Sequence, residues 1–368
     1  MRLICEGLDL SDAVLKVIKA TATRTTNPIL EGIKLKAGED ELVLSATDLE
    51  ISIEKSIPAD VKIPGEIVVP GKFFADFVKK LSSEQIELTQ TNNSTLKIKY
   101  TDSEGYLQCM NAEEFPLIKP FNESDSFSVS KFDFRDLIDK TVFAVAVDDA
   151  RPILKGCKFE IEGDTITVAA LDGFRIAQVK HKLISTTKNM SFVVPARSLS
   201  EISKLIDGDD EELKVYVSSS YLMVTLGNTK IITRKLEGDF INYKSALNTN
   251  TTSSVIINKR QLEFGLERAS LLARLNTNNL VKFDIKDKLL TLTSSSDIGN
   301  VTENITIALE GKDLTIAFNA RYISDCLHNI NEEYIKINFA SSIYPCTICS
   351  PDNDSYIFVV FPVRLVTD

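Results

Sequence analysis

An internal repeat of about 124 residues is the feature that most constrains how this chain can fold. Four features of the first copy return in the same order in the second copy, at offsets of 124 or 125 residues. They are residues 28–32 (PILEG) and 152–156 (PILKG), Asp48 and Asp172, residues 69–72 (VPGK) and 194–197 (VPAR), and Glu114-Phe115 and Asp239-Phe240. A weaker third copy is marked by residues 318–321 (FNAR). The periodicity predicts three similar units.

The length of 368 residues accommodates three domains of ordinary size. Two polar segments, residues 121–126 and 248–254, are typical of linkers between such domains. We therefore expect domains at 1–124, 125–250 and 251–368.

The composition indicates a soluble globular protein, with 43% hydrophobic and 26% charged residues. No apolar run approaches the roughly 18 residues that span a bilayer, so we expect no membrane association. The acidic residues Glu6 and Asp9 follow the first residues closely, which argues against a signal peptide. Six dispersed cysteines suggest reduced thiols and a cytoplasmic protein.

Hydrophobic periodicity predicts two helices in each unit, separated by strands. The helical windows are 5–20, 70–81, 129–143, 195–206, 258–274 and 319–330. Alternating runs at 42–44, 166–168, 224–226 and 314–316 predict strands, and Gly163-Asp164 and Gly227-Asn228 predict hairpin turns. Pro70 and Pro195 are expected at first helical positions. The fold class is therefore α+β.

Charge is distributed unevenly along the chain. The six helical windows contain 15 Lys and Arg residues against 11 Asp and Glu, a balance of +4, whereas the whole chain carries −10. If the helices face one place, that place is a basic surface on an acidic protein, suited to nucleic acid. The alternative is that these charges are simply solvated.

Motifs for chemistry are weak. Cys346 and Cys349 form a CxxC, but zinc needs further ligands, and His181 and His328 lack ligand spacing. The acids at 148–149 and 209–212 are interpreted as solvated loop residues. No P-loop, GxSxG or GxGxxG pattern occurs. The sequence therefore predicts no catalytic residue, no metal, no cofactor and no enzyme.

Several segments together resemble one family over the whole chain. They are residues 24–30 (RTTNPIL), 46–50 (ATDLE), 69–74 (VPGKFF), 171–176 (LDGFRI), 236–240 (LEGDF) and 361–365 (FPVRL). In this set the chain resembles the bacterial DNA polymerase III beta subunit, the sliding clamp. The resemblance implies three domains of DNA-clamp type, each with two helices on antiparallel sheet, and a head-to-tail homodimer closed into a ring.

The resemblance implies a processivity factor that encircles double-stranded DNA without reading its sequence, through weak contacts to phosphates. Arg24 and Arg197 match family positions near the DNA, and Asp148 stands where relatives carry a neutral polar residue. The remaining DNA-binding candidates come from helix placement: Lys72, Lys79, Lys80, Arg135, Lys204, Arg260, Arg268 and Arg321.

A second implied surface is a pocket between domains 2 and 3 that binds short linear motifs of DNA polymerase and clamp-loader subunits. The matching residues are Leu154, Leu171, Gly173, Arg175, Ile176, Ile241, Ala246, Tyr322, Ile343, Pro345, Val359, Val360, Phe361, Pro362, Val363, Arg364 and Leu365. We expect apolar walls to bury anchors while Arg175 and Arg364 orient the polar peptide backbone. Leu171, Phe174, Ile241 and Ser245 depart from well-studied relatives and predict a more apolar pocket.

Two features of this surface have other interpretations. Residues 359–361 could form an ordinary buried strand, although Pro362 within the apolar run favours an exposed edge strand. At the implied dimer interface, Tyr106, Leu271 and Leu272 match family positions, while Leu271 and Leu272 could instead be core.

One alternative is a repeat-built protein that has diverged from clamps towards a small-molecule or enzymatic role. Arg175 together with residues 362–365 favours the clamp. A specialised second clamp is also compatible with the sequence.

Overall fold

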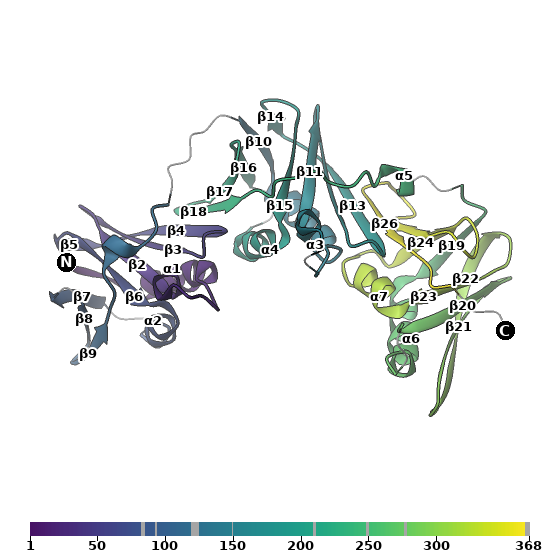
Figure 1. Ribbon diagram of the computed structural model, residues 1–368, viewed down its shortest axis with the longest axis horizontal. Helices are drawn as coiled ribbons and strands as arrows, with labels where there is room; N and C mark the ends of the chain where they lie inside the picture. Colours follow the sequence, from purple (N-terminus) through teal and green to yellow (C-terminus); the bar gives the residue numbers. More distant parts are fainter. Residues whose placement is uncertain are drawn as a thin grey trace. The chain divides into compact units, whose positions relative to one another are not determined.

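The computed structural model describes residues 1–81, 85–92, 94–118, 125–148, 150–208, 211–247, 250–275 and 278–364. The chain divides into two compact units (Figure 1). Unit 1 comprises Met1–Lys131, Ile184–Thr187 and Glu201–Lys235, and unit 2 comprises Phe132–Leu183, Lys188–Ser200 and Leu236–Asp368. The expected boundary at residue 124 lies outside the described residues, so the positions of the domain boundaries remain a prediction.

Unit 1 contains two sheets in which all strand pairs are antiparallel. The five-stranded sheet has the order β5 (Asp60–Ile63), β1 (Arg2–Glu6), β7 (Gln85–Asn92), β8 (Thr95–Tyr100) and β9 (Ser103–Gln108). The nine-stranded sheet has the order β14 (Ser185–Thr186), β10 (Asp125–Ser130), β16 (Glu212–Val217), β17 (Tyr221–Leu226), β18 (Thr229–Arg234), β4 (Ile51–Pro58), β3 (Glu41–Thr47), β2 (Gly32–Ala37) and β6 (Gly65–Pro70).

Unit 2 is built on one antiparallel sheet of twelve strands. Its order is β15 (Met190–Pro195), β11 (Gly156–Glu162), β12 (Thr165–Leu171), β13 (Arg175–Lys182), β26 (Tyr356–Val360), β25 (Cys346–Cys349), β24 (Tyr334–Phe339), β19 (Ser253–Asn258), β22 (Gly299–Gly311), β21 (Leu289–Ser296), β20 (Leu280–Lys286) and β23 (Leu314–Asn319). The expected strands and both hairpin turns are confirmed, since they fall within or between β3, β11, β12, β17, β18 and β23.

All six predicted helices are present. They are α1 (Gly7–Val17), α2 (Gly71–Val78), α3 (Lys131–Val142), α4 (Ala196–Leu205), α6 (Lys259–Ala273) and α7 (Ala320–His328). Each buries an apolar stripe; in α7 the buried residues include Ile323, Cys326 and Leu327. Asn258 and Asn319 cap α6 and α7, because their side chains accept a backbone N–H of the first turn. A short helix, α5 (Lys244–Leu247), was not predicted.

The prediction for Pro70 and Pro195 is wrong by one residue. Pro70 is the last residue of β6 and Pro195 the last of β15, and each helix begins at the next position. The fixed φ of proline suits extended backbone as well as a first helical turn, so the motif marks a strand-to-helix junction.

The repeated PILxG motif has one structural role in both copies. Residues Pro28–Glu31 and Pro152–Lys155 each form a 3₁₀ turn, and the following glycine opens β2 or β11. A Cβ on Gly32 would lie 2.4 Å from Val68 Cγ1, and one on Gly156 would lie 2.7 Å from Val193 Cγ1. Glycine is therefore required where the strand is pressed against its neighbour.

Candidate functional site

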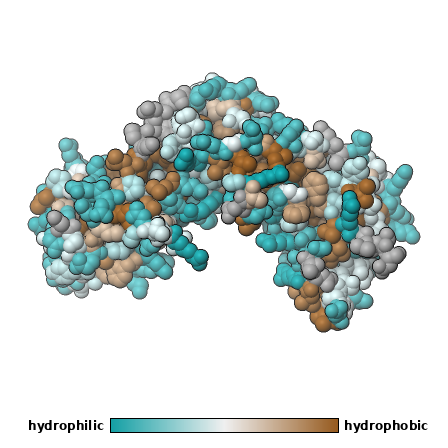
Figure 2. Space-filling view, in the orientation of Figure 1, coloured by the Kyte–Doolittle hydropathy of each residue, from teal (hydrophilic) through white to brown (hydrophobic). Residues whose placement is uncertain are grey.

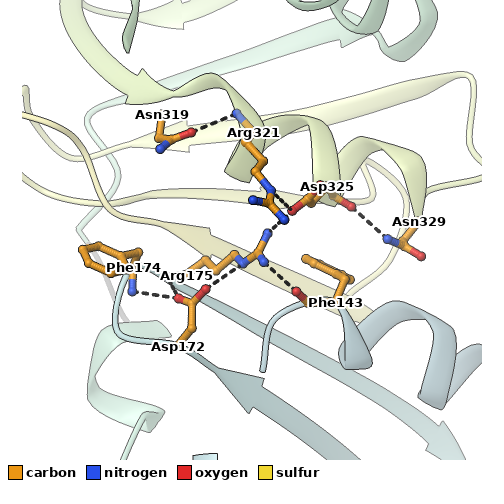
Figure 3. A network of polar contacts seen from close by, with 8 residues as sticks. All are labelled: Phe143, Asp172, Phe174, Arg175, Asn319, Arg321, Asp325 and Asn329. Carbon is orange, nitrogen blue, oxygen red and sulfur yellow. Dashed lines mark hydrogen bonds and ion pairs between the residues drawn. The ribbon is translucent and has the colours of Figure 1, made fainter. Parts of the chain in front are cut away.

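Arg175, at the start of β13, is the centre of a polar network in unit 2 (Figure 3). Its Nε donates to Asp172 Oδ2 at 3.0 Å, and its Nη2 donates to the carbonyl oxygen of Phe143 at 2.6 Å. Its Nη1 donates to Asp325 of α7 at 2.5 Å. The rings of Phe143 and Tyr322 lie 5.4 and 5.0 Å from the guanidinium, within cation–π range.

The turn before β13 sets the position of Arg175. Asp172 Oδ1 accepts the backbone N–H groups of Phe174 and Arg175 at 2.9 and 3.0 Å. Gly173, which follows Asp172, has φ +92°, a value that a residue with a side chain rarely adopts. The same aspartate thus holds both the backbone and the guanidinium of Arg175.

The expectation that Arg175 orients the backbone of a bound peptide stays a prediction, because its hydrogen bonds within the chain use three of its five N–H groups. Its three guanidinium nitrogens all donate to groups of this chain, and the residue is only 6% exposed. Its contacts join β13 to α7 through Asp325 and place the guanidinium against the ring of Tyr322.

An apolar cluster brings together much of the predicted pocket. Seven of the predicted residues belong to it: Leu154, Leu171, Ile176, Ile241, Ala246, Val359 and Phe361. They pack with Ala146, Ile153, Ala169, Phe240, Tyr243, Leu247 and Ile357. Tyr243 anchors its segment by donating its hydroxyl to Glu160 Oε2 at 2.8 Å. Sequence reasoning missed Phe240 and Tyr243 as cluster members, although residues 239–240 belong to the repeat.

The predicted pocket residues 359–365 lie partly in a strand, because β26 ends at Val360. Val359 and Val360 are fully buried in β26, between β13 and β25, which confirms an ordinary buried strand for them. The exposed edge strand expected for the run around Pro362 is wrong, because residues 361–364 form no strand. β26 ends before Pro362. Beyond it, the N–H of Phe361 donates to Phe174 O at 2.9 Å and that of Val363 donates to Ala317 O at 2.8 Å. Leu365 lies outside the described residues.

The other predicted pocket residues, together with Phe174, differ in their exposure to solvent. Phe174 is 58% exposed and stacks on Tyr322 at 5.7 Å, and Ile343 is 72% exposed. Gly173 and Arg364 are exposed, Pro362 is half-buried, and Pro345 is buried. On the face drawn in Figure 2, apolar residues form patches among hydrophilic ones. Such surfaces can bury the apolar anchors of a peptide.

The predicted DNA-binding residues are mostly exposed on helices. Those classed as exposed are Arg24, Lys72, Lys79, Lys80, Arg197, Lys204, Arg260, Arg268 and Arg321, whereas Arg135 is half-buried. Arg268 is ion-paired, because its Nε and Nη2 form a bidentate pair with Glu303 at 2.8 and 2.6 Å. This pairing raises the pKa of Arg268 and lowers that of Glu303. Lys204 is also paired, since its Nζ donates to Glu201 Oε1 at 2.8 Å.

His328 occupies the position of the third copy that corresponds to two predicted DNA-binding lysines. It follows Lys204 by 124 residues, and Lys204 follows Lys79 by 125 residues. All three side chains are exposed near the end of the second helix of their copy. The repeat offset therefore relates all three positions, although His328 was not among the predicted residues.

The predicted interface residues lie on exposed elements. Tyr106 is 61% exposed on β9, the last strand of its sheet. Leu271 is 65% exposed and Leu272 half-buried on α6, so the interpretation of this pair as core is wrong.

The cysteine pair lies in a strand, and the described acids of the two acidic segments are exposed. Cys346 and Cys349 occupy the strand β25, where positions three apart face opposite sides, and burial raises the pKa of the Cys346 thiol to about 12. Among the described residues, no group of three or more potential ligands could hold a metal ion. Asp148 and Glu211 are exposed, whereas Asp149 and residues 209–210 lie outside the described residues. No helix in the described ranges is long and apolar enough to cross a membrane.

Comparison with known proteins assigns the family. Sequence profiles of the DNA polymerase III beta subunit match in chain order: the N-terminal domain at 1–119, the central domain at 128–242 and the C-terminal domain at 244–364. The Beta sliding clamp of Bacillus subtilis (strain 168) is 31% identical over 367 residues, covering 96% of this chain and 97% of that protein. The chain belongs to the DNA polymerase III beta subunit family.

Other beta subunits agree with this assignment. The Beta sliding clamp of Staphylococcus epidermidis is 31% identical over 357 residues, with 94% of this chain and 95% of that protein covered. The DNA polymerase sliding clamp structure from Bacillus subtilis matches with a TM-score of 0.95 at 30% identity, covering 99% of each chain. A Pseudomonas aeruginosa sliding clamp bound to griselimycin matches with a TM-score of 0.93 at 25% identity, covering 99% of this chain and all of that one. The expected α+β fold of three clamp domains is confirmed.

Proposed function

We propose that the chain is a DNA polymerase processivity factor: two copies close head to tail into a cytoplasmic ring that encircles duplex DNA and tethers polymerase and clamp-loader subunits by their linear motifs. No catalytic step is part of this proposal, because a closed ring retains a circular duplex by topology. Weak contacts of the helical cations to phosphates then suffice and permit sliding.

A recurring strand junction carries the proposal. The strands β4, β13 and the first half of β22 begin at Ile51, Arg175 and Gly299, each 124 residues after the last. β4 pairs with β18, and β13 pairs with β26. In the described part of the chain, residues 299–306 of β22 pair only with β21, and β9, the counterpart of β18 and β26, pairs only with β8. Two junctions are thus formed within the chain, and both halves of a third are open.

Both internal junctions have the same register. Ile51 lies opposite Thr233, the fifth residue of β18, and Arg175 lies opposite Val360, the fifth residue of β26. Applied to the third junction, this register places Gly299 of one copy opposite Leu107 of the other, and Val301 opposite Gly105. Unpaired strand edges readily pair with another chain. A second copy is therefore the natural partner of β9, next to the exposed Tyr106.

A crosslink tests this junction. With Gly105→Cys and Val301→Cys combined, mild oxidation should convert the protein to a covalent dimer, since directly opposed side chains lie about 5 Å apart at their Cβ atoms. A Cβ on Gly105 meets only Phe77 Cζ at 3.6 Å, an ordinary contact. Each single variant is the control. A monomeric mass in light scattering, or no crosslink in the double variant, would contradict the junction.

Retention on DNA tests the function. The protein is loaded on a nicked circle with a clamp loader, washed in high salt, and the circle is then cut. We expect retention on the circle and loss after cutting. Leu272→Asp should give a monomer that is not retained, whereas Leu289→Asp, at an exposed leucine of β21, is a control expected to stay dimeric. Equal loss of wild type from both DNA forms would contradict the ring and favour a diverged, non-clamp role.

The apolar cluster, the exposed Phe174 and Ile343, and the half-buried Tyr322 support a peptide pocket in unit 2. We propose that residues Leu154, Leu171, Ile176, Ile241, Ala246, Val359 and Phe361 form its floor, and that Arg364 and Pro362 lie at its rim. Arg175 acts beneath it as a positioning residue.

A further inference from the structure

A cleft of about 430 Å³ lies in unit 2 between the end of α6 and α7. It is lined by Ser270, Arg274, Asn279, Ala320, Arg321, Ser324, Asp325 and His328. Of these, only Arg321 was predicted from the sequence to bind DNA. The lining is polar, with hydroxyl, amide and guanidinium groups that can donate hydrogen bonds.

The cleft has an excess of positive charge. Arg274 and Arg321 contribute guanidinium groups, and Asp325 is the one carboxylate in the lining. Asp325 accepts the buried Arg175 from the opposite side at 2.5 Å, while Arg321 Nε is 3.8 Å away (Figure 3). Arg175 is shared between Asp172 and Asp325, so Arg175 and Arg321 together balance these two carboxylates. The charge of Arg274 is then left for an anion, with the Nη groups of Arg321 beside it as further donors.

The internal repeat supports a shared role for part of this lining. Arg321 corresponds to Arg197 and Lys72, and His328 corresponds to Lys204 and Lys79, at offsets of 124 or 125 residues. In each copy the two positions are seven residues apart, which places them on one helix face about 10.5 Å apart along the axis. Arg274 has no such counterpart and adds a further cation in the third copy alone.

We infer that the α6–α7 cleft binds a phosphate group of the DNA backbone, with Arg274 and Arg321 as its ligands; the inference rests on the proposed function. The planar fork of arginine fits phosphate oxygens with two parallel hydrogen bonds, which a lysine cannot provide. The same chemistry would accept free phosphate, so the source of the group has to be distinguished by experiment.

The salt dependence of duplex binding tests the inference. A fluorescent linear duplex with free ends is titrated with the intact protein over a range of salt, for wild type, Arg274→Gln and Lys286→Gln. Lys286 is the control because it is exposed at the end of β20, where the alternating residues Val281, Phe283 and Ile285 are buried. We expect Arg274→Gln to reduce the slope of log K against log salt by about 0.9, the contribution of one phosphate contact, and Lys286→Gln to leave it unchanged.

Three outcomes would overturn the inference. They are a wild-type slope in Arg274→Gln, an equal reduction in both variants, and a thermal shift with inorganic phosphate that needs Arg274 when duplex binding does not. The last would assign the cleft to a free anion. A failure of the proposed clamp function can be distinguished from a failure of this inference by the retention experiment, because wild-type protein would then be lost from the uncut circle. Arg274→Gln should still be retained on that circle, because topology needs no single phosphate contact.

Discussion

The first and second copies of the repeat build the same turn but place it in different surroundings. Asp48 Oδ1 accepts the N–H groups of Glu50 and Ile51 just as Asp172 Oδ1 accepts those of Phe174 and Arg175. The third residue after each aspartate begins a strand and is buried in both copies, but it is Ile51 in unit 1 and Arg175 in unit 2. Local geometry is thus repeated, whereas the residue after the turn is fitted to what packs on it.

A helix pair shows the same contrast. Asp12 and Lys16 of α1 return 124 residues later as Asp136 and Lys140 of α3, both as ion pairs one helical turn apart. Asp12 is half exposed, whereas the side chain of Asp136 is 12% exposed and also lies 2.8 Å from His181 Nε2. The comparison teaches that one sequence pattern can give a weak surface pair in one unit and a buried network in another.

The largest expected effect comes from giving the second copy the residue of the first. Arg175→Ile leaves Asp172 and Asp325 without their buried partner and should lower the free energy of unfolding by about 3–5 kcal/mol. Urea unfolding measures it. Asp172→Asn and Asp325→Asn added to Arg175→Ile should recover part of the loss, since no uncompensated carboxylate remains. An unchanged unfolding midpoint in Arg175→Ile would contradict the network.

The two ion pairs should differ in their response to acid. Burial alone would raise the pKa of Asp136, but the hydrogen bonds and charges of His181 and Lys140 outweigh it and lower that pKa. Its contribution to stability is therefore present above the ordinary pKa of 3.8 and is lost as pH falls through the lowered value. Asp136→Asn should cost about 1.5–3 kcal/mol at pH 7 and less in acid.

Asp12→Asn is the matched control for this experiment and should cost at most about 1 kcal/mol. Unfolding midpoints at pH 7 and pH 3 compare the two variants. An equal cost for both at pH 7 would mean that burial does not distinguish the pairs.

The smallest effect concerns the turns themselves. Leu49 and Gly173 occupy the same turn position with φ of +77° and +92°. Gly173→Leu should destabilise unit 2 by about 1–2 kcal/mol, because a side chain disfavours this conformation. Leu49→Gly relieves the equivalent strain and should cost nothing measurable in unit 1. Limited proteolysis of each unit provides the readout, and equal losses in both variants would contradict the equivalence of the turns.

Sequence periodicity was sufficient to predict the helices and strands, whose formation depends on residues close along the chain. The six amphipathic helices and the tested strands follow from periods of 3.6 and 2, which burial on one side imposes. The helix α5 was missed because four residues at 244–247 are too few to show a period. The helices expected to begin at Pro70 and Pro195 begin one residue later, since strand and helix both accept the φ of proline.

The site was only partly predictable. The family resemblance identified seven residues that the structure collects in one apolar cluster, but not their partners Phe240 and Tyr243. It also gave Arg175 without its partner Asp325, which is 150 residues away. Likewise, Pro362 suggested an edge strand, whereas β26 ends before it and lies inside the sheet.

The sequence by itself determined the repeat, the helices, the turns at Asp48 and Asp172, and the family, because each depends on contacts close along the chain or on residue identity. Only the tertiary structure decided that Arg175 is buried between β13 and α7, that Asp136 is buried while Asp12 is not, and that β22 and β9 keep open edges. These depend on which distant segments exclude water from a side chain or a strand edge, and solvent exclusion is a property of packing that no local pattern encodes.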